Sequence, residues 1–265
     1  MASFVEPCYQ LRVRYRALLF DLFRTVVLLR PEAPTMRVTE PSWRSAMQAL
    51  RAPMEEALTT LSFDDFLDAV VTVTDEIVRQ RPPEYYEVSV RERYRRAFIR
   101  VGLESSVAEA MADRFSLLQT RQLVIHSEVP AAHLTLLHQL ATRYRLGLVS
   151  NFDHAPTVRE VLSRHGISDV FSVTLISDEF GRRKPHPAIF REALRRLGMT
   201  AEEALCIGDS FAEDVRGPAA VGIDAVWINP GAAAVPAGGP RPRYVLSTLP
   251  ELAVLLDLTG RSPAQ

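Results

Sequence analysis

The sequence predicts an α/β protein: a doubly wound parallel sheet, Rossmann-like in plan, with an inserted α-helical domain. Two observations predict the sheet. The apolar run Ala17–Phe20 has the length of a buried strand, and strand-like and helix-like segments alternate after residue 133. The third observation is that the stretch from residue 43 to residue 122 shows only helical patterns. We therefore expect one α/β core that is interrupted by a helical bundle.

Composition agrees with an ordinary globular protein. The 265 residues are 47% hydrophobic and 24% charged, with a net charge of −1, so no polyanionic partner such as nucleic acid is expected. No run reaches the ~18 apolar residues of a membrane span, and the N-terminus lacks a signal-type apolar segment. The two cysteines are Cys8 and Cys206, and Cys206 lies in an apolar run, as a buried reduced thiol would. We expect a cytoplasmic protein; its oligomeric state is left open.

The predicted domain boundaries follow the changes of pattern. Residues 1–16 form an appended N-terminal segment with no assigned function, and residues 259–265 form a tail. Three prolines between residues 28 and 44 exclude a continuous helix and indicate a linker that leaves the first strand. The core is expected at 17–28 and 127–258, and the helical cap at 29–126.

Inside the helical region, start and stop signals separate the helices. Residues 61–78 place their apolar side chains on roughly one helical face, and Ser62 is positioned to cap that helix. Pro82-Pro83 ends it. The sequence from Ser106 to Glu109 fits a capping box, which predicts a second helix start at Ser106.

After the helical region, the chain alternates between the two kinds of element. Strands are predicted at Leu146–Val149, Val173–Ile176, Leu205–Ile207, Ala225–Ile228 and Tyr244–Leu246. Helices are predicted at His133–Tyr144, Pro156–His165, Pro187–Leu197, Glu213–Val221 and Leu249–Leu256. The Ala-, Gly- and Pro-rich stretch Gly231–Pro242 is expected to be a surface loop.

Polar residues follow four of these segments in a fixed order. They are Asp21-x-x-x-Thr25, Ser150-Asn151, Lys184-Pro185 and Gly208-Asp209-Ser210-x-x-x-Asp214. An aspartate after a strand is by itself usually a turn residue, but the ordered set resembles the four motifs of the haloacid dehalogenase superfamily of hydrolases. The resemblance covers roughly residues 17–256, and the 129 positions between the first two motifs leave room for the helical cap of that superfamily. It implies a hydrolase.

The resemblance and the chemistry of phosphate together assign the catalytic residues. A carboxylate that attacks a phosphate monoester needs a cation to offset the repulsion between the two anions. Asp21 is the expected nucleophile, Lys184 the cation that balances the carboxylates, and Ser150 a donor to a phosphoryl oxygen. Thr25 is expected to orient the nucleophile and its loop.

The same reasoning assigns the metal and substrate contacts. Asp21 and Asp209 are expected to hold Mg²⁺, which prefers hard oxygen ligands. The resemblance implies the backbone carbonyl of Phe23 as a further ligand, with Asp214 in or beside the second shell. Substrate binding is assigned to Asn151 and to Arg24, which stands where a small residue is common.

One position departs from the pattern of the phosphatases. Many of them carry a second aspartate two residues after the nucleophile, which transfers a proton to the leaving group, and this chain has Phe23 there. General acid–base help is worth ~10²–10⁴ in rate, so alkyl phosphates should be cleaved poorly and activated esters less so. Dehalogenases proper commonly have an aromatic residue at this position.

Three hypotheses follow. The first is a Mg²⁺-dependent phosphatase that acts on a small phosphorylated metabolite or an activated ester through an aspartyl-phosphate on Asp21. The second is a metal-independent 2-haloacid dehalogenase that takes a halogenated substrate; Phe23 favours it, but the acidic Asp209 does not. In this second hypothesis, Arg44 could meet the substrate carboxylate. The third is a catalytically weak binding protein with the same fold.

Overall fold

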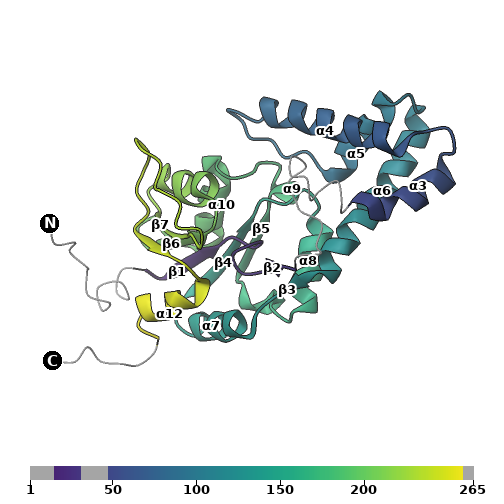
Figure 1. Ribbon diagram of the computed structural model, residues 1–265. Helices are drawn as coiled ribbons and strands as arrows, with labels where there is room; N and C mark the ends of the chain where they lie inside the picture. The colour runs from purple at the N-terminus through teal and green to yellow at the C-terminus, as the bar shows by residue number, and fades with distance from the viewer. Residues whose placement is uncertain (1–14, 31–46, 259–265) are drawn as a thin grey trace, which may run out of the picture.

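The structure is a computed structural model that describes residues 15–30 and 47–258. Its centre is a six-stranded sheet in the order β5-β4-β1-β6-β7-β8, with every neighbouring pair parallel (Figure 1). The strands are β1 (Ala17–Phe20), β4 (Arg145–Ser150), β5 (Val173–Ile176), β6 (Ala204–Gly208), β7 (Asp224–Ile228) and β8 (Tyr244–Leu246). Each overlaps a segment predicted from the sequence.

Helices cover both faces of the sheet, as a doubly wound fold requires. On one face, Leu18 and Phe20 of β1 join a buried cluster with α7 (Ala131–Ala141), α8 (Ala155–Arg164) and α12 (Leu252–Leu255). On the other face, Ala17 and Leu19 join a cluster with α10 (Pro187–Leu197). Side chains of β1 thus point alternately to the two layers because successive residues of a strand face opposite sides. The predicted fold class is confirmed.

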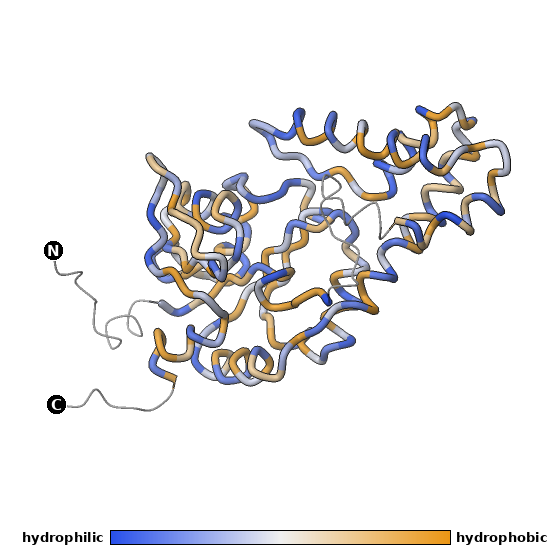
Figure 2. Tube along the Cα trace, viewed as in Figure 1, coloured by the Kyte–Doolittle hydropathy of each residue, from blue (hydrophilic) through white to orange (hydrophobic). Residues whose placement is uncertain are grey.

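Residues 47–125 form a helical insertion with its own apolar core. It contains η1 (Gln48–Leu50), α3 (Arg51–Ala57), α4 (Phe63–Gln80), α5 (Val90–Arg100) and α6 (Ser105–Ile125). Phe66 and Phe98 stack at its centre with ring centroids 4.4 Å apart. Along α4, hydrophobic and hydrophilic residues alternate with the helical turn, because one face packs and the other meets water (Figure 2).

A short antiparallel ribbon lies where the chain leaves the core and returns to it. It pairs β2 (Leu28–Leu29) with β3 (Ser127–Glu128). The domain boundaries expected at 28/29 and 126/127 lie within or beside this ribbon, and they stay a prediction. The segment 1–14, the tail 259–265, and the linker with Trp43, Arg44 and its three prolines lie outside the described residues.

One predicted helix cap is confirmed and one is wrong. Ser62 caps α4, with its hydroxyl accepting from the backbone N–H of Asp65 at 3.3 Å. The predicted start at Ser106 is wrong, because α6 begins at Ser105 without a side-chain cap. The preceding turn decides this: Gly102 has φ 92°, and the N–H of Leu103 bonds to the carbonyl of Phe98, so α5 and α6 follow each other closely.

The helix predicted at Glu213–Val221 differs from the structure in form. A π-helical turn, η3 (Phe211–Arg216), precedes the short α11 (Gly217–Ala219). The widened turn holds the buried Asp214, and such turns often occur at functional sites. The remaining short elements are η2 (Ser168–Val170), α9 (Ser177–Phe180) and η4 (Leu249–Glu251). Within the described part of the chain, none of the helices combines the length and apolarity that crossing a membrane needs.

Candidate active site

Three neighbouring strands deliver the predicted residues to one edge of the sheet. Asp21 follows β1, Ser150 ends β4, and Asp209 follows β6. These strands are adjacent in the order β4-β1-β6, and the chain changes direction through the sheet at β1. Open α/β sheets bind ligands at such a point, outside the carboxyl ends of the strands. The topology therefore brings together three motifs that are far apart in the sequence.

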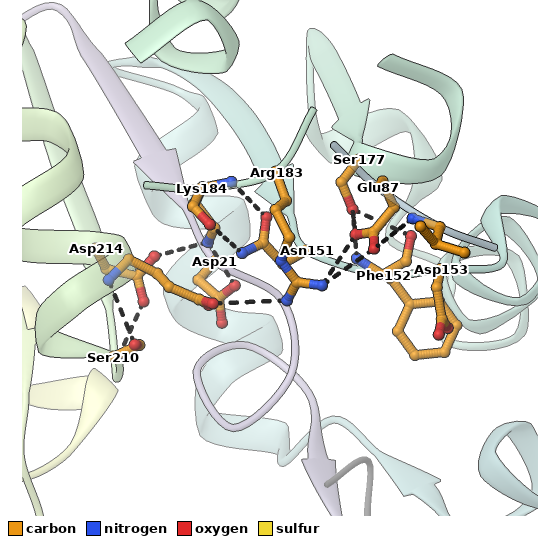
Figure 3. Close-up of polar contacts among 12 residues, drawn as sticks. Asp21, Glu87, Asn151, Phe152, Asp153, Ser177, Arg183, Lys184, Ser210 and Asp214 are labelled. Atoms are coloured by element: carbon orange, nitrogen blue, oxygen red, sulfur yellow. Dashed lines mark hydrogen bonds and ion pairs between the residues drawn. The ribbon is translucent and has the colours of Figure 1, made fainter. Parts of the chain in front are cut away.

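Lys184 links two of the acids (Figure 3). Its Nζ donates to Oδ1 of Asp21 at 2.8 Å and to Oδ1 of Asp214 at 2.6 Å, and the lysine is fully buried. Burial acts to lower the pKa of Lys184, but the charges of Asp21 and Asp214 outweigh it and raise that pKa. The lysine therefore stays charged and fixes the carboxylate of the predicted nucleophile.

Asn151 holds this lysine in place. Its Nδ2 donates to the carbonyl of Lys184 at 2.9 Å, and its Oδ1 accepts from the backbone N–H of Lys184 at 2.7 Å. Both polar atoms of the amide are thus engaged with the chain of the lysine. Substrate binding by Asn151 stays a prediction, and the observed geometry favours a positioning role.

Asp214 is positioned by its own loop and by a glycine. Its Oδ2 accepts from the backbone N–H of Ser210 at 3.0 Å. A Cβ on Gly208 would lie only 2.2 Å from Cγ of Asp214, so only glycine leaves room for this carboxylate. This contact explains why the fourth motif has glycine directly before Asp209.

The three aspartates form an oxygen-rich cluster. Asp21, Asp209 and Asp214 each offer a carboxylate oxygen, and these oxygens lie within 4.8 Å of one another. Burial, followed by the charge of Asp21, raises the pKa of Asp209 to about 6; burial likewise raises the pKa of Asp214. The buried ammonium of Lys184 and the exposed guanidinium of Arg24 are the cations in contact with these three carboxyl groups, so acidic groups outnumber cations in the cluster. Such a donor set fits a hard divalent cation such as Mg²⁺.

Arg24 contacts this cluster from the loop after β1. Its Nη2 lies 3.1 Å from Oδ2 of Asp209, and its side chain is 55% exposed. Its φ of 69° lies in the left-handed region, where glycine is the usual residue. The prediction that Arg24 binds substrate stays untested; in this structure its guanidinium pairs with a predicted metal ligand. The same aspartate accepts a hydrogen bond at its backbone carbonyl from Nε1 of Trp227 at 2.9 Å, a contact the sequence did not indicate.

Phe23 places its ring in the apolar core. It is only 5% exposed and packs against Phe152, with ring centroids 5.0 Å apart. The position that carries a proton donor in many related phosphatases therefore forms part of the apolar cluster. The role of its backbone carbonyl as a metal ligand stays a prediction.

Two hydroxyls complete the predicted set. Ser150 is buried at the end of β4, and Thr25 is buried in the loop after β1. Oγ1 of Thr25 has no hydrogen-bond partner in the structure, and a buried unpaired hydroxyl costs about 1–3 kcal/mol. A substrate or bound solvent that supplies this partner would recover that free energy.

The turn between α4 and α5 lies against the core beside the loop that carries Lys184. The sequence leaves open whether Glu87 lines the mouth of the site or lies in an exposed turn between two helices, and in the structure its side chain is only 1% exposed. It accepts from Oγ of Ser177 at 2.6 Å and pairs with Arg183 at 3.1 Å (Figure 3). Arg183 also lies 3.6 Å from Glu213. Only the fold brings these charges together, since 96 positions separate Glu87 from Arg183.

Comparison with known proteins identifies the family of the chain. The family model described as haloacid dehalogenase-like hydrolase matches residues 15–222. The chain belongs to the haloacid dehalogenase-like hydrolases. The resemblance inferred from the four motifs is therefore confirmed, and so is the expectation of a hydrolase.

Two curated relatives illustrate the range of similarity within this hydrolase family. The chain is 30% identical over 225 residues to a glyceraldehyde 3-phosphate phosphatase of Methanopyrus kandleri. This match spans 82% of this chain and 84% of that protein. It is 38% identical over 104 residues to the enzyme of the same name from Pyrococcus abyssi. That second match spans 39% of this chain and only 43% of the length of the relative.

A solved structure supports the fold of this family member. The 2-haloacid dehalogenase from Pseudomonas syringae superposes with a TM-score of 0.71 at 23% identity, covering 92% of this chain and 99% of that one. At this identity the likeness concerns the fold, including the inserted helical domain.

Proposed function

We propose that this haloacid dehalogenase-like hydrolase is a Mg²⁺-dependent phosphoric monoester hydrolase that forms an aspartyl-phosphate on Asp21. The observation that carries the proposal is the cluster in which Lys184 bridges Asp21 and Asp214 beside Asp209. The names of the two phosphatase relatives agree with it. We propose a small phosphorylated molecule as substrate.

The metal site would be built from oxygens already close together. Asp21 and Asp209 would hold Mg²⁺, with the carbonyl of Phe23, while Asp214 supports the site through Lys184 and Ser210. When bound, Mg²⁺ supplies the positive charge that lets an anionic carboxylate approach a dianionic phosphate.

The residues of the chain can carry two displacements at phosphorus. In the first, a carboxylate oxygen of Asp21 bonds to phosphorus, and the bond from phosphorus to the leaving oxygen breaks. In the second, a water oxygen bonds to phosphorus, the bond to Asp21 breaks, and inorganic phosphate leaves. Lys184 would hold the nucleophile, to which it already donates a hydrogen bond, and the hydroxyls of Ser150 and Thr25 would donate to phosphoryl oxygens.

The buried ring of Phe23 limits the substrates that can react well. A phenyl ring cannot protonate an alkoxide leaving group, and such help is typically worth ~10²–10⁴ in rate. We therefore propose that esters with a stabilised leaving oxygen are cleaved faster than simple alkyl esters.

The alternative activity is hydrolysis of a 2-haloacid without metal. Phe23 favours this alternative because halide departs without a proton. The cluster around Asp209 opposes it, because carboxylates with raised pKa values gain most from a bound cation. The phosphatase is therefore the better-supported activity.

One experiment separates these activities. Phosphate release from an aryl phosphate and halide release from 2-chloropropionate are measured with Mg²⁺ and with a chelator. We expect phosphate release that the chelator abolishes and that Asp21→Asn and Asp209→Asn reduce at least a hundredfold. Halide release that survives the chelator would establish the dehalogenase instead. If a folded protein is silent in both assays, the third hypothesis, a catalytically weak binding protein, is favoured.

The cytoplasmic location also belongs to the proposal. Cys206 is buried on β6 and is a free thiol, which agrees with a reducing compartment. Cys8 lies outside the described residues.

A further inference from the structure

Two arginines where the helical insertion meets the core have buried donors without partners. Arg81 follows α4, and Arg93 lies on α5. In the described structure, Nε of each guanidinium is buried and has no hydrogen-bond acceptor. Buried polar groups are nearly always paired, so two such donors in one region require an explanation.

The acids nearby are already engaged by other arginines. Asp153 accepts from Nη2 of Arg93 at 2.5 Å, and Glu87 pairs with Arg183. Among the described residues, no carboxylate forms an ion pair with Arg81. Burial, followed by the charge of Arg183, lowers the pKa of Arg81 to about 10. The charges of Glu87 and Glu213 also act on Arg81, but both carboxylates pair with Arg183, so Arg81 has no ion-pair partner of its own in the described structure.

This region borders the proposed catalytic cluster. Arg183, whose charge acts on Arg81, directly precedes Lys184, and it also faces Glu213, which directly precedes Asp214. In the close-up, Arg183 lies between the residues around Asp21 and the side chain of Glu87 (Figure 3). A group attached to a phosphate bound at Asp21 would extend toward this region.

We propose that Arg81 and Arg93 form a subsite for a carboxylate on the leaving group of the substrate. The inference rests on the proposed phosphatase function and narrows the substrate to phosphate monoesters that carry a second anionic group. A carboxylate suits the subsite because it accepts hydrogen bonds from guanidinium groups at both oxygens. It would satisfy the free Nε donors and supply the anion that Arg81 lacks.

Binding of two matched compounds tests the subsite. Calorimetry in the presence of Mg²⁺ compares 3-phosphoglycerate with glycerol 3-phosphate, which ends in a hydroxymethyl group where the first compound has a carboxylate. The background is Asp21→Asn, which blocks turnover. We expect Arg81→Gln to weaken 3-phosphoglycerate binding roughly tenfold or more, as for the loss of a charged hydrogen bond, and to leave glycerol 3-phosphate nearly unchanged.

Control variants separate recognition from structure. Arg79→Gln removes an exposed arginine of α4, two positions before Arg81. It should change the affinity for neither 3-phosphoglycerate nor glycerol 3-phosphate. Arg81→Lys keeps the charge and should recover part of the lost affinity. The melting temperature of Arg81→Gln should stay level or rise, because the change removes a buried cation without a partner.

Each outcome decides the matter. A selective loss with 3-phosphoglycerate supports the subsite, and a matching rise in KM for that compound in the Asp21-containing enzyme adds to it. Equal losses for both compounds, or no loss, overturn it and leave Arg81 a structural or water-bonded residue. Selective binding together with no phosphate release from the aryl phosphate in the Asp21-containing enzyme would sustain the subsite and refute the phosphatase. If wild type binds neither compound, the subsite is refuted, and the aryl phosphate assay alone decides on the phosphatase.

Discussion

At the scale of single residues, Gly208 shows how an absent side chain can set catalytic geometry. We predict that Gly208→Ala displaces Asp214, because the new Cβ would lie 2.2 Å from its Cγ, and thereby breaks the buried pair with Lys184. Loss of such a pair costs about 3–5 kcal/mol of stability, and aryl phosphate turnover should fall at least tenfold. Urea unfolding and steady-state turnover measure the two effects.

A second glycine provides the control for this change. An added Cβ at Gly231 meets no atom within 4 Å, so Gly231→Ala should change stability by less than about 0.5 kcal/mol. Normal turnover in Gly208→Ala would contradict the role assigned to Asp214.

Arg24 competes with a cation for Asp209. We predict that Arg24→Gly raises the affinity for Mg²⁺ about two- to fivefold, the range that an exposed ion pair supports. Glycine also accepts the left-handed backbone at this position without strain. Calorimetric titration of the substrate-free protein with MgCl₂ measures the change. Arg30→Gly, which removes an exposed arginine paired with Glu128, is the control; equal affinities in all three proteins would show that Arg24 and metal do not compete.

At the scale of elements, two serines with similar local sequence have opposite roles. We predict that Ser62→Ala costs about 1 kcal/mol, because its hydroxyl caps α4. Ser106→Ala should be neutral or stabilising by a few tenths of a kcal/mol, since Ser106 lies exposed in the first turn of α6, where alanine favours the helix. Thermal unfolding of the two variants gives the comparison. An equal loss of stability in both would show that Ser106 also caps a helix, as the sequence predicts.

The start of α5 should give the protein a measurable acid sensitivity. Hydrogen bonds from Arg95, opposed by burial and aided by Arg96, lower the pKa of Glu92 to about 2. Its charged form therefore stabilises the fold above the ordinary carboxyl pKa near 4.5, and this stability is lost as pH falls toward 2. Because these side chains are partly exposed, we predict that Glu92→Gln costs about 1 kcal/mol at pH 7 and clearly less at pH 3. Urea unfolding of wild type and variant at both pH values measures the free-energy cost of the substitution. An equal cost at pH 7 and pH 3 would contradict the assigned role of Glu92.

At the scale of the whole molecule, the turn at residues 84–90 attaches the helical insertion to the core. The backbone N–H of Glu87 donates to the carbonyl of Gly181 at 3.0 Å, and that of Arg183 to Tyr85 at 2.9 Å. The buried carboxylate of Glu87 adds bonds to Ser177 and Arg183. Backbone and side-chain contacts thus hold the same two segments together.

We predict that Glu87→Gln costs roughly 2 kcal/mol and speeds amide exchange across residues 84–90. The loss is smaller than for a fully broken buried pair, because Glu213 still faces Arg183. Glu84→Gln, at an exposed pair with Arg182, should cost less than about 1 kcal/mol. Hydrogen exchange with mass spectrometry measures the effect, and unchanged exchange in Glu87→Gln would assign the attachment to the backbone bonds alone.

Much of the fold was predictable because its signals are local. The runs around Leu18, Leu148 and Ile207 are apolar since strands buried between two helical layers need no polar face. Helix α10 was predicted with its observed bounds, because proline at its first position and glycine after its last are strong boundary signals. The start of α6 was missed because the glycine turn at Gly102, which ends α5, fixes it in place of the capping pattern at Ser106.

The sequence by itself determined the order of strands and helices along the chain, the family, and the four polar motifs, three of which follow strands. Each depends on short-range patterns: hydrophobic period, turn residues and the spacing of a few chemically necessary side chains. Only the tertiary structure decided that Lys184 bonds both Asp21 and Asp214, that Arg24 lies on Asp209, and that Glu87 is buried. Lys184 is 163 positions from Asp21, and the two charges meet only because the fold brings the loop between α9 and α10 to the end of β1. The residues around Asp21 and around Lys184 contain no local pattern that predicts this contact.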